Sequence, residues 1–197
     1  GSNLLSTLTA ATLPRLLSVD VQSNRLTALA LSDMPNLTTV TASNNWITTF
    51  TGASLPRLSN LYLSSNRLAS LDVTGLTELT NLNVSSNRLT SLTLGSLEYL
   101  SQVTASNNSL TSITVANLPM LSYLNLGSNK LTQFVATGVP RLETLYISSN
   151  KMSTLTLADY PVLANLSVDG NPFTSLTLTN LPSLTSFTEK MTKQRPS

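Results

Sequence analysis

The sequence predicts a mostly β protein built as a single solenoid of parallel strands. The stretch LSNLYLSSNRLASL at residues 58–71 places leucines at fixed distances around an asparagine, and this arrangement recurs every 21 residues. Apolar and polar residues alternate in both halves of the repeat, which is the period of a β-strand. No insertion or deletion interrupts the interval. We therefore predict one array over residues 1–188, of about eight full repeats with partial ends, followed by a polar tail at residues 189–197.

One asparagine marks each repeat. These residues are Asn24, Asn45, Asn66, Asn87, Asn108, Asn129, Asn150 and Asn171, and Asn3 lies one interval earlier. We number each repeat from the leucine eight residues before this asparagine, which is then position 9. A sharp turn after a strand leaves backbone groups facing inward, and a buried asparagine has both a donor and an acceptor to satisfy them. We predict a stacked ladder of asparagines with a structural role.

The two halves of the repeat are predicted to form two kinds of segment. Positions 4 and 6 are apolar and positions 3 and 5 mostly polar, so each repeat gives a short strand. Successive strands then lie in parallel, about 4.8 Å apart. The second half alternates leucine with Thr and Ser, which disfavour a helix interior, so we expect extended segments or turns there. A proline at position 20 of most repeats fixes the corner before the next strand.

The repeat pattern LxxLxLSSNxLTSLTLxxLPxL resembles the short leucine-rich repeats of bacterial surface proteins, the internalin-like and BspA-like groups, and the resemblance covers nearly the whole chain. It implies a right-handed curved solenoid whose strands form a concave sheet. It also implies adhesion or protein recognition, with the ligand on that concave face. The period is one residue shorter than is typical of internalins, and their helical cap is absent. Protist surface proteins with similar repeats and a designed repeat array remain alternatives.

Composition excludes several functions. The chain has no cysteine and no histidine, which rules out disulfides, thiolate metal sites and histidine-based nucleophiles. We expect no enzyme activity, no cofactor and no metal. A net charge of +2 does not favour nucleic acid, and no apolar run reaches the roughly 18 residues of a membrane span. Only 10% of the residues are charged, and Ser, Thr and Asn occupy most polar positions instead. This composition favours an extracellular or cell-surface protein.

The strand side chains at positions 3 and 5 are the first candidate binding surface, because they point away from the core. Tyrosine among Asn, Gln and Thr resembles the composition of known recognition surfaces. The candidate residues are Tyr62, Asn81, Asn83, Gln102, Tyr123, Asn125, Thr144 and Tyr146. Tyr123 and Tyr146 fall on neighbouring strands, so we expect them to lie side by side.

Position 10 is the second candidate surface. Its candidate residues are Trp46, Arg67, Arg88, Lys130 and Lys151, and Arg25 occupies the same position one repeat before Trp46. Stacked coils would align them as a basic ridge along one rim, which could attract an acidic protein or an anionic glycan. A large aromatic on such a ridge could lie against Arg25 or Arg67 as a cation–π contact.

These features favour a non-enzymatic protein-recognition or adhesion module, with a protein ligand on the concave face. One alternative is a structural spacer, which would need no clustered aromatics. Another is a glycan or polyanion binder that uses the basic rim. We expect a monomer or a weak end-to-end dimer.

Overall fold

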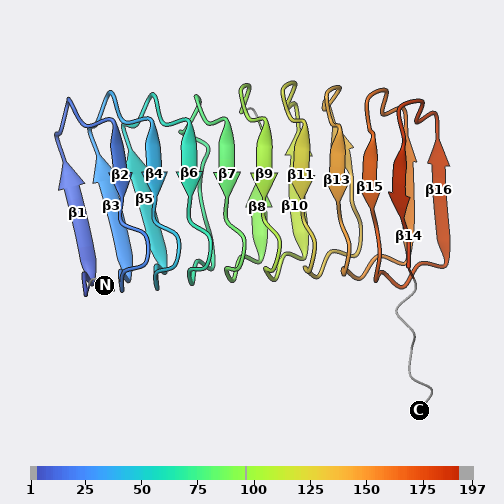
Figure 1. Ribbon diagram of the computed structural model, residues 1–197, viewed down its shortest axis with the longest axis horizontal. Coiled ribbons are helices and arrows are strands. Elements are labelled where there is room, and N and C mark those ends of the chain that lie inside the picture. The colour runs from blue at the N-terminus through green and yellow to red at the C-terminus, as the bar shows by residue number, and fades with distance from the viewer. Residues whose placement is uncertain (1–3, 96, 191–197) are drawn as a thin grey trace, which may run out of the picture.

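The computed structural model describes residues 4–95 and 97–190, which form a solenoid of stacked coils (Figure 1). None of these residues is helical, so the predicted mostly β solenoid is confirmed. Asn3 and most of the predicted tail, residues 191–197, lie outside the described residues. The handedness and curvature of the array stay predictions.

One face of the solenoid is a parallel sheet in which each coil supplies one three-residue strand. Its nine strands are β2 (Ser18–Asp20), β4 (Thr39–Thr41), β6 (Asn60–Tyr62), β7 (Asn81–Asn83), β9 (Gln102–Thr104), β11 (Tyr123–Asn125), β13 (Thr144–Tyr146), β15 (Asn165–Ser167) and β17 (Ser186–Thr188). Each strand pairs with the next at an offset of 21 residues, as Leu61 with Leu82 shows. The pairing register is therefore the sequence period itself.

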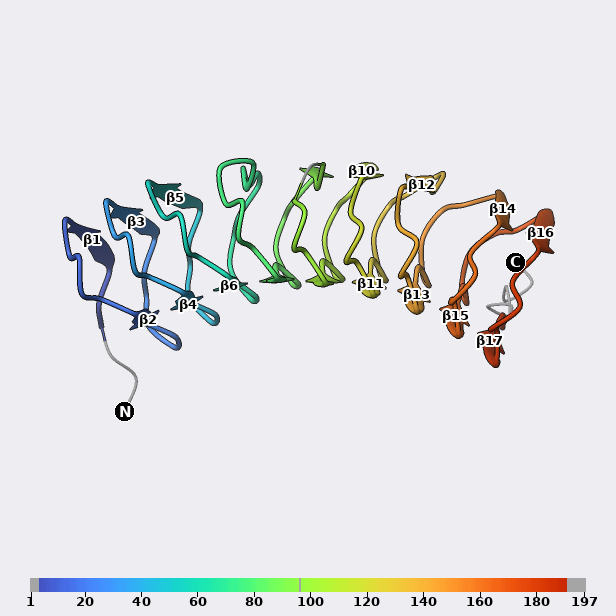
Figure 2. The same cartoon turned by 90° about the horizontal axis from the view of Figure 1, so that it is seen from above.

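The opposite face carries three smaller parallel sheets. The view from above shows the strands of the two faces on opposite sides of the coils (Figure 2). The first contains β1 (Thr7–Ala11), β3 (Ala28–Ser32) and β5 (Thr49–Ala53). The second contains β8 (Ser91–Thr93), β10 (Ser112–Ala116) and β12 (Ala136–Thr137), and the third β14 (Thr154–Ala158) and β16 (Ser175–Thr179). These strands correspond to the extended segments predicted for the second half of the repeat.

This second face is interrupted where one coil turns instead of extending. Residues 71–75 form no strand, and the Asp72 carboxylate accepts hydrogen bonds from the Thr74 amide and hydroxyl, at 2.9 and 2.7 Å. Such a local side-chain-to-backbone bond competes with sheet pairing. A second interruption follows β12, which has two residues and pairs with β10 but not with β14. The 21-residue period alone did not reveal either break.

The core runs between the two faces as one continuous cluster of aliphatic side chains. In the coil that starts at Leu58, the side chains of Leu58, Leu61, Leu63 and Leu68 are fully buried. Neighbouring coils repeat this arrangement, so each layer of leucines is covered by the next. A coil in such an array is stable only against its neighbours.

A corner of unusual backbone conformation precedes each ladder asparagine. Position 8 has a positive φ in all eight repeats from Ser23 to Gly170, between 54° and 58° where it is Ser or Asn and 68° at Gly170. The non-glycine members are Ser23, Asn44, Ser65, Ser86, Asn107, Ser128 and Ser149. The left-handed conformation costs most L-residues roughly 1–2 kcal/mol, and Gly and Asn tolerate it best. In the sequence, the only indication of this corner was that position 8 is always Ser, Asn or Gly.

Candidate functional site

The ladder asparagines connect adjacent coils through side-chain hydrogen bonds. The Asn66 side-chain oxygen accepts a hydrogen bond from the Ile47 amide of the preceding coil at 2.9 Å. Its amide nitrogen donates to the carbonyl oxygens of Ala42 and Leu63, at 2.9 and 3.0 Å. Equivalent bonds recur at Asn45, Asn87, Asn108, Asn129, Asn150 and Asn171. With donors and acceptor occupied, these side chains hold the coils together and do not offer a ligand site.

The ladder is incomplete at its first member. Asn24 is half-buried, and its side-chain oxygen has no hydrogen-bond partner among the described residues. The donor expected from the ladder pattern is the amide of Leu5, 19 residues earlier, but the Leu5 side chain is 41% exposed in the partial first coil. Asn87 and Asn108 are also half-buried rather than buried, although they keep the full set of bonds.

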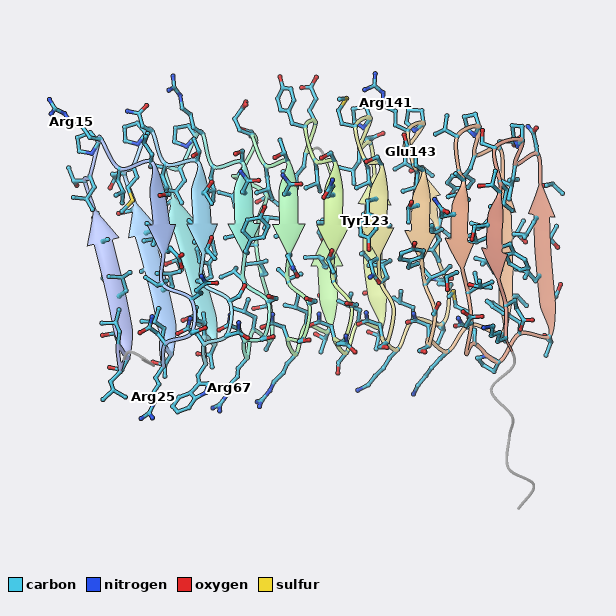
Figure 3. The ribbon with its side chains drawn as sticks, in the orientation of Figure 1. Arg15, Arg25, Arg67, Tyr123, Arg141 and Glu143 are labelled. Carbon is cyan, nitrogen blue, oxygen red and sulfur yellow. The ribbon has the colours of Figure 1, made fainter. Side chains whose placement is uncertain are left out.

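Two tyrosines form a packed pair on the nine-stranded sheet, about halfway along the array where Figure 3 labels Tyr123. Tyr123 begins β11 and Tyr146 ends β13, the next strand of the sheet. Their ring centroids are 5.8 Å apart and the rings are nearly perpendicular, at 87°. This edge-to-face geometry is a favourable aromatic contact. Both side chains are half-buried, so each presents an exposed part on the outer side of the sheet.

Two of the predicted asparagines on this face are bonded to the segment that follows their own strand. The Asn125 side-chain oxygen accepts a hydrogen bond from the Gly127 amide at 3.0 Å, and its nitrogen lies 3.5 Å from the Tyr123 hydroxyl. Asn83 accepts bonds from the amide and hydroxyl of Ser85, at 3.1 and 2.7 Å. The predicted polar neighbours are therefore held in place, and the tyrosine pair is the centre of the candidate surface.

The other predicted sheet residues lie on the same face but outside the pair. Asn81 donates to the Asn60 side-chain oxygen at 2.7 Å, and Thr144 accepts from Asn165 at 3.3 Å. Gln102 is exposed. Tyr62 is in β6, three strands from β11 in the sheet, so it does not belong to the Tyr123–Tyr146 cluster.

The rim residues lie at exposed positions away from the tyrosine pair. Trp46 lies between two cations, with the guanidinium carbon of Arg67 at 5.1 Å and that of Arg25 at 5.8 Å from its ring centroid. Arg25 and Arg67 lie on one long edge of the solenoid, while Arg141 lies on the opposite edge (Figure 3). Arg88, Lys130 and Lys151 are exposed at the same position of later coils. The packing reason for Trp46 is therefore its contact with the two arginines.

Tyr160 marks a feature that the sequence analysis missed. Beside the break after β12, residues Ala136, Gly138, Val139, Pro140, Ala158, Asp159, Tyr160 and Pro161 line an open hollow of about 480 Å³. The Tyr160 hydroxyl spans this break and donates to the Ala136 carbonyl oxygen at 3.3 Å. Burial raises the pKa of Tyr160. The sequence feature that could have indicated this site is the tyrosine at position 19, a position that is occupied by Met, Leu or Val in the preceding repeats.

The acidic residues are scattered over the described part of the chain. Among them, no group of three or more carboxylates is placed to hold a metal ion. Asp20 ends β2 and Asp169 follows β15, seven strands away in the sheet, or about 34 Å at the usual strand spacing. No helix in the described part of the chain could cross a membrane.

No protein-family profile and no curated protein sequence matches the chain. Solved structures do match it. A chain of the LRIM1/APL1C complex superposes with a TM-score of 0.77 and 26% identity, over 87% of this chain and 33% of that one. A leucine-rich-repeat protein of Leptospira interrogans gives 0.72 and 25%, over 88% of this chain and 48% of that one. YopM, a leucine-rich effector protein from Yersinia pestis, gives 0.73 and 27%, over 96% of this chain and 58% of that one. This chain therefore spans a third to somewhat over half of these matched chains.

Proposed function

Because the chain has the leucine-rich-repeat fold of these structures, we propose that it is a non-enzymatic protein-interaction module that binds its partner on the nine-stranded sheet. The observation that carries this proposal is the edge-to-face pair of Tyr123 and Tyr146 on adjacent strands of that sheet. The similarity to leucine-rich-repeat structures supports a recognition role for the array as a whole.

The two tyrosine side chains are held in place before a partner binds. A tyrosine has few rotatable bonds and a large amphipathic surface, so fixing it in a complex costs little conformational entropy. Here the contact between the rings restricts both side chains before a partner arrives, and Asn125 adds a hydrogen-bonded neighbour. Preorganised aromatic anchors of this kind commonly dominate the free energy of a protein interface.

We propose further that the module acts outside the cell or at its surface, in adhesion or recognition. The support is compositional: 10% of the residues are charged, and short uncharged polar side chains occupy most exposed strand positions. A partner that fits this face would offer an apolar side chain to the tyrosine rings and hydrogen-bonding groups to the surrounding Asn and Thr.

The test is to immobilise the chain, capture partners from cell-surface extracts, and measure the affinity of each purified partner for variants. We expect Tyr123→Ala with Tyr146→Ala to weaken binding at least tenfold, since truncating a hot spot costs about 2 kcal/mol or more. The melting temperature should barely change, because neither side chain belongs to the buried core.

Tyr99→Ala is the matched control, because Tyr99 is 46% exposed and lies outside the nine-stranded sheet. We expect it to bind like the parent chain. If the double variant also binds like the parent, the partner does not use the sheet at the tyrosine pair. If no surface extract yields a partner, the structural-spacer alternative is favoured.

A further inference from the structure

The rim opposite Arg141 carries a row of cations that the proposed sheet site does not use. We define the basic rim as Arg25, Trp46, Arg67, Arg88, Lys130 and Lys151, all exposed at position 10 of their coils. Ser109 is the one uncharged interruption between Arg88 and Lys130. Since each coil advances by about 4.8 Å, the five cations lie along a line of roughly 29 Å.

No acidic residue neutralises this row locally. The columns at positions 8 to 12 of the eight repeats contain Ser, Asn, Gly, Thr, Ala, Pro and apolar residues besides the rim residues themselves, but no Asp or Glu. Seven of the nine acidic residues lie on the sheet, on the opposite face or at the opposite corner of the coils, while Asp169 and Glu189 follow β15 and β17 in coils beyond Lys151. The rim is thus strongly positive even though the net charge of the chain is only +2.

Trp46 restrains the two arginines in the N-terminal part of the basic rim. Its ring lies between Arg67 and Arg25, at 5.1 and 5.8 Å from the two guanidinium carbons. Two long side chains are thereby restrained without the loss of their charge, and their N–H groups stay available to an anion. An isolated surface arginine would lose more side-chain entropy when it binds a ligand.

The arrangement favours one class of ligand. A protein partner normally needs an apolar, desolvated centre, but the one aromatic of this rim, Trp46, is flanked by the charged groups of Arg25 and Arg67. A nucleic-acid single strand needs a series of aromatic faces on which successive bases can stack, and the rim has a single aromatic residue, Trp46. A linear polysaccharide with sulfate groups needs only a straight series of cations, from which it displaces counterions.

We propose that the basic rim is a binding site for a linear sulfated glycan, with Trp46 as the residue that positions Arg25 and Arg67. The sulfate groups lie along the rim and accept charge-assisted hydrogen bonds from the guanidinium groups, which suit oxyanions in a bidentate geometry. Lys130 and Lys151 extend the site to longer chains. This site is separate from the tyrosine pair and does not depend on the sheet-binding proposal.

The experiment uses a size-defined heparin oligosaccharide as the probe and two readouts. The chain has a single tryptophan, so its fluorescence reports on the rim itself. We expect saturable binding that changes Trp46 emission and weakens steeply with salt. We expect Arg67→Gln with Arg88→Gln to weaken binding at least tenfold by calorimetry, and to lower the salt slope by about 1 to 2.

The matched control is Arg15→Gln with Arg141→Gln, which removes the same charge from the opposite edge (Figure 3). We expect this control and Tyr123→Ala with Tyr146→Ala to bind heparin within twofold of the parent. Trp46→Leu keeps every charge but should weaken binding about threefold, because the two arginines lose the ring between them.

Three results would overturn the proposal. In the first, the rim variant and the opposite-edge control lose the same affinity, which would indicate binding by net charge alone. In the second, heparin binds without any change in Trp46 emission. In the third, polyglutamate or polyuridylate of equal charge binds the rim as tightly as the sulfated oligosaccharide, which would assign the rim to an acidic polypeptide or a nucleic acid instead.

Discussion

Asn66 shows how one side chain can connect three points of the backbone across adjacent coils. It is 8% exposed, accepts from the Ile47 amide and donates to the Ala42 and Leu63 carbonyls. Asn66→Ala leaves these groups buried without partners, so we expect the free energy of unfolding to fall by about 1–3 kcal/mol. Urea denaturation measures this. Gln102→Ala, at an exposed sheet position, is the control that should leave stability nearly unchanged.

Similar stability of Asn66→Ala and Gln102→Ala would show that the ladder bonds contribute little. Asn87→Ala offers a graded comparison, because Asn87 makes the same kinds of bond but is only half-buried. Water can replace part of the hydrogen bonding that the backbone groups lose in Asn87→Ala. The loss of unfolding free energy for this variant should therefore fall at the lower end of the same range.

At this residue scale the sequence predicted the asparagines but not the corner beside them. A regular interval identifies which residues are equivalent, and a buried amide has an evident task at a turn. The positive φ at Ser65 and Ser86 was not evident, because serine has no strong preference for that conformation. The surrounding hydrogen bonds impose it: the Ser65 amide donates to the Ser85 carbonyl of the next coil at 2.9 Å.

At the scale of elements, Tyr160 compensates for the break between β12 and β14. Its hydroxyl bonds to the Ala136 carbonyl where no strand pairing joins the two coils. We expect Tyr160→Phe to lower the free energy of unfolding by about 1 kcal/mol at pH 7, since the carbonyl loses its donor.

This difference should depend on pH. Burial raises the pKa of Tyr160 above its usual value of 10.0, so the folded chain keeps a proton that the unfolded chain releases. The Tyr160 contribution is therefore complete below pH 10 and is lost as the pH rises through the pKa of the folded state. Denaturation curves at pH 7, 9, 10 and 11 should show the gap between parent and Tyr160→Phe closing above pH 10. A gap that stays constant over this range would mean that the hydroxyl is not shielded from solvent.

The nine-stranded sheet followed directly from alternation at positions 4 and 6, because the core leaves only one register in which leucines stack on leucines. The second face was predicted only as extended segments or turns. Its division into three sheets depends on local features such as the bonds between Asp72 and Thr74. A pattern shared by all repeats does not show features that occur in one repeat alone.

At the scale of the whole molecule, the sequence predicted which residues align on each candidate surface, but it did not predict the contacts between their side chains. Stacking by 21 residues aligns position 10 along one edge, so the ridge could be inferred before any geometry was known. The contact of Trp46 with both arginines depends on side-chain conformation, and so do the hydrogen bonds of Asn83 and Asn125 to the segments after their strands. The identity of a partner depends on chemistry outside the chain, which no repeat pattern encodes.

Stability should also vary along the array, because each coil is held by its neighbours. The amide at position 10 donates to the preceding coil in the seven repeats from Arg25 to Lys151, which allows equivalent hydrogen bonds to be compared. The Arg25 amide donates to Leu5 at 3.1 Å, whereas the Arg88 amide donates to Leu68 at 2.8 Å. Leu5 is 41% exposed and Leu68 is fully buried, and the first ladder asparagine lacks an acceptor bond.

We therefore predict that the Arg25 amide exchanges with deuterium at least tenfold faster than the Arg88 amide, because the first coil opens without unfolding the rest. Residue-resolved hydrogen exchange by NMR measures both amides in one sample, with the Arg67 and Lys130 amides as further mid-array references. Equal protection of Arg25 and Arg88 would contradict this gradient and would point to a covered first coil. Repeating the measurement over a range of protein concentrations then tests whether a second copy covers it, since protection by a partner copy rises with concentration.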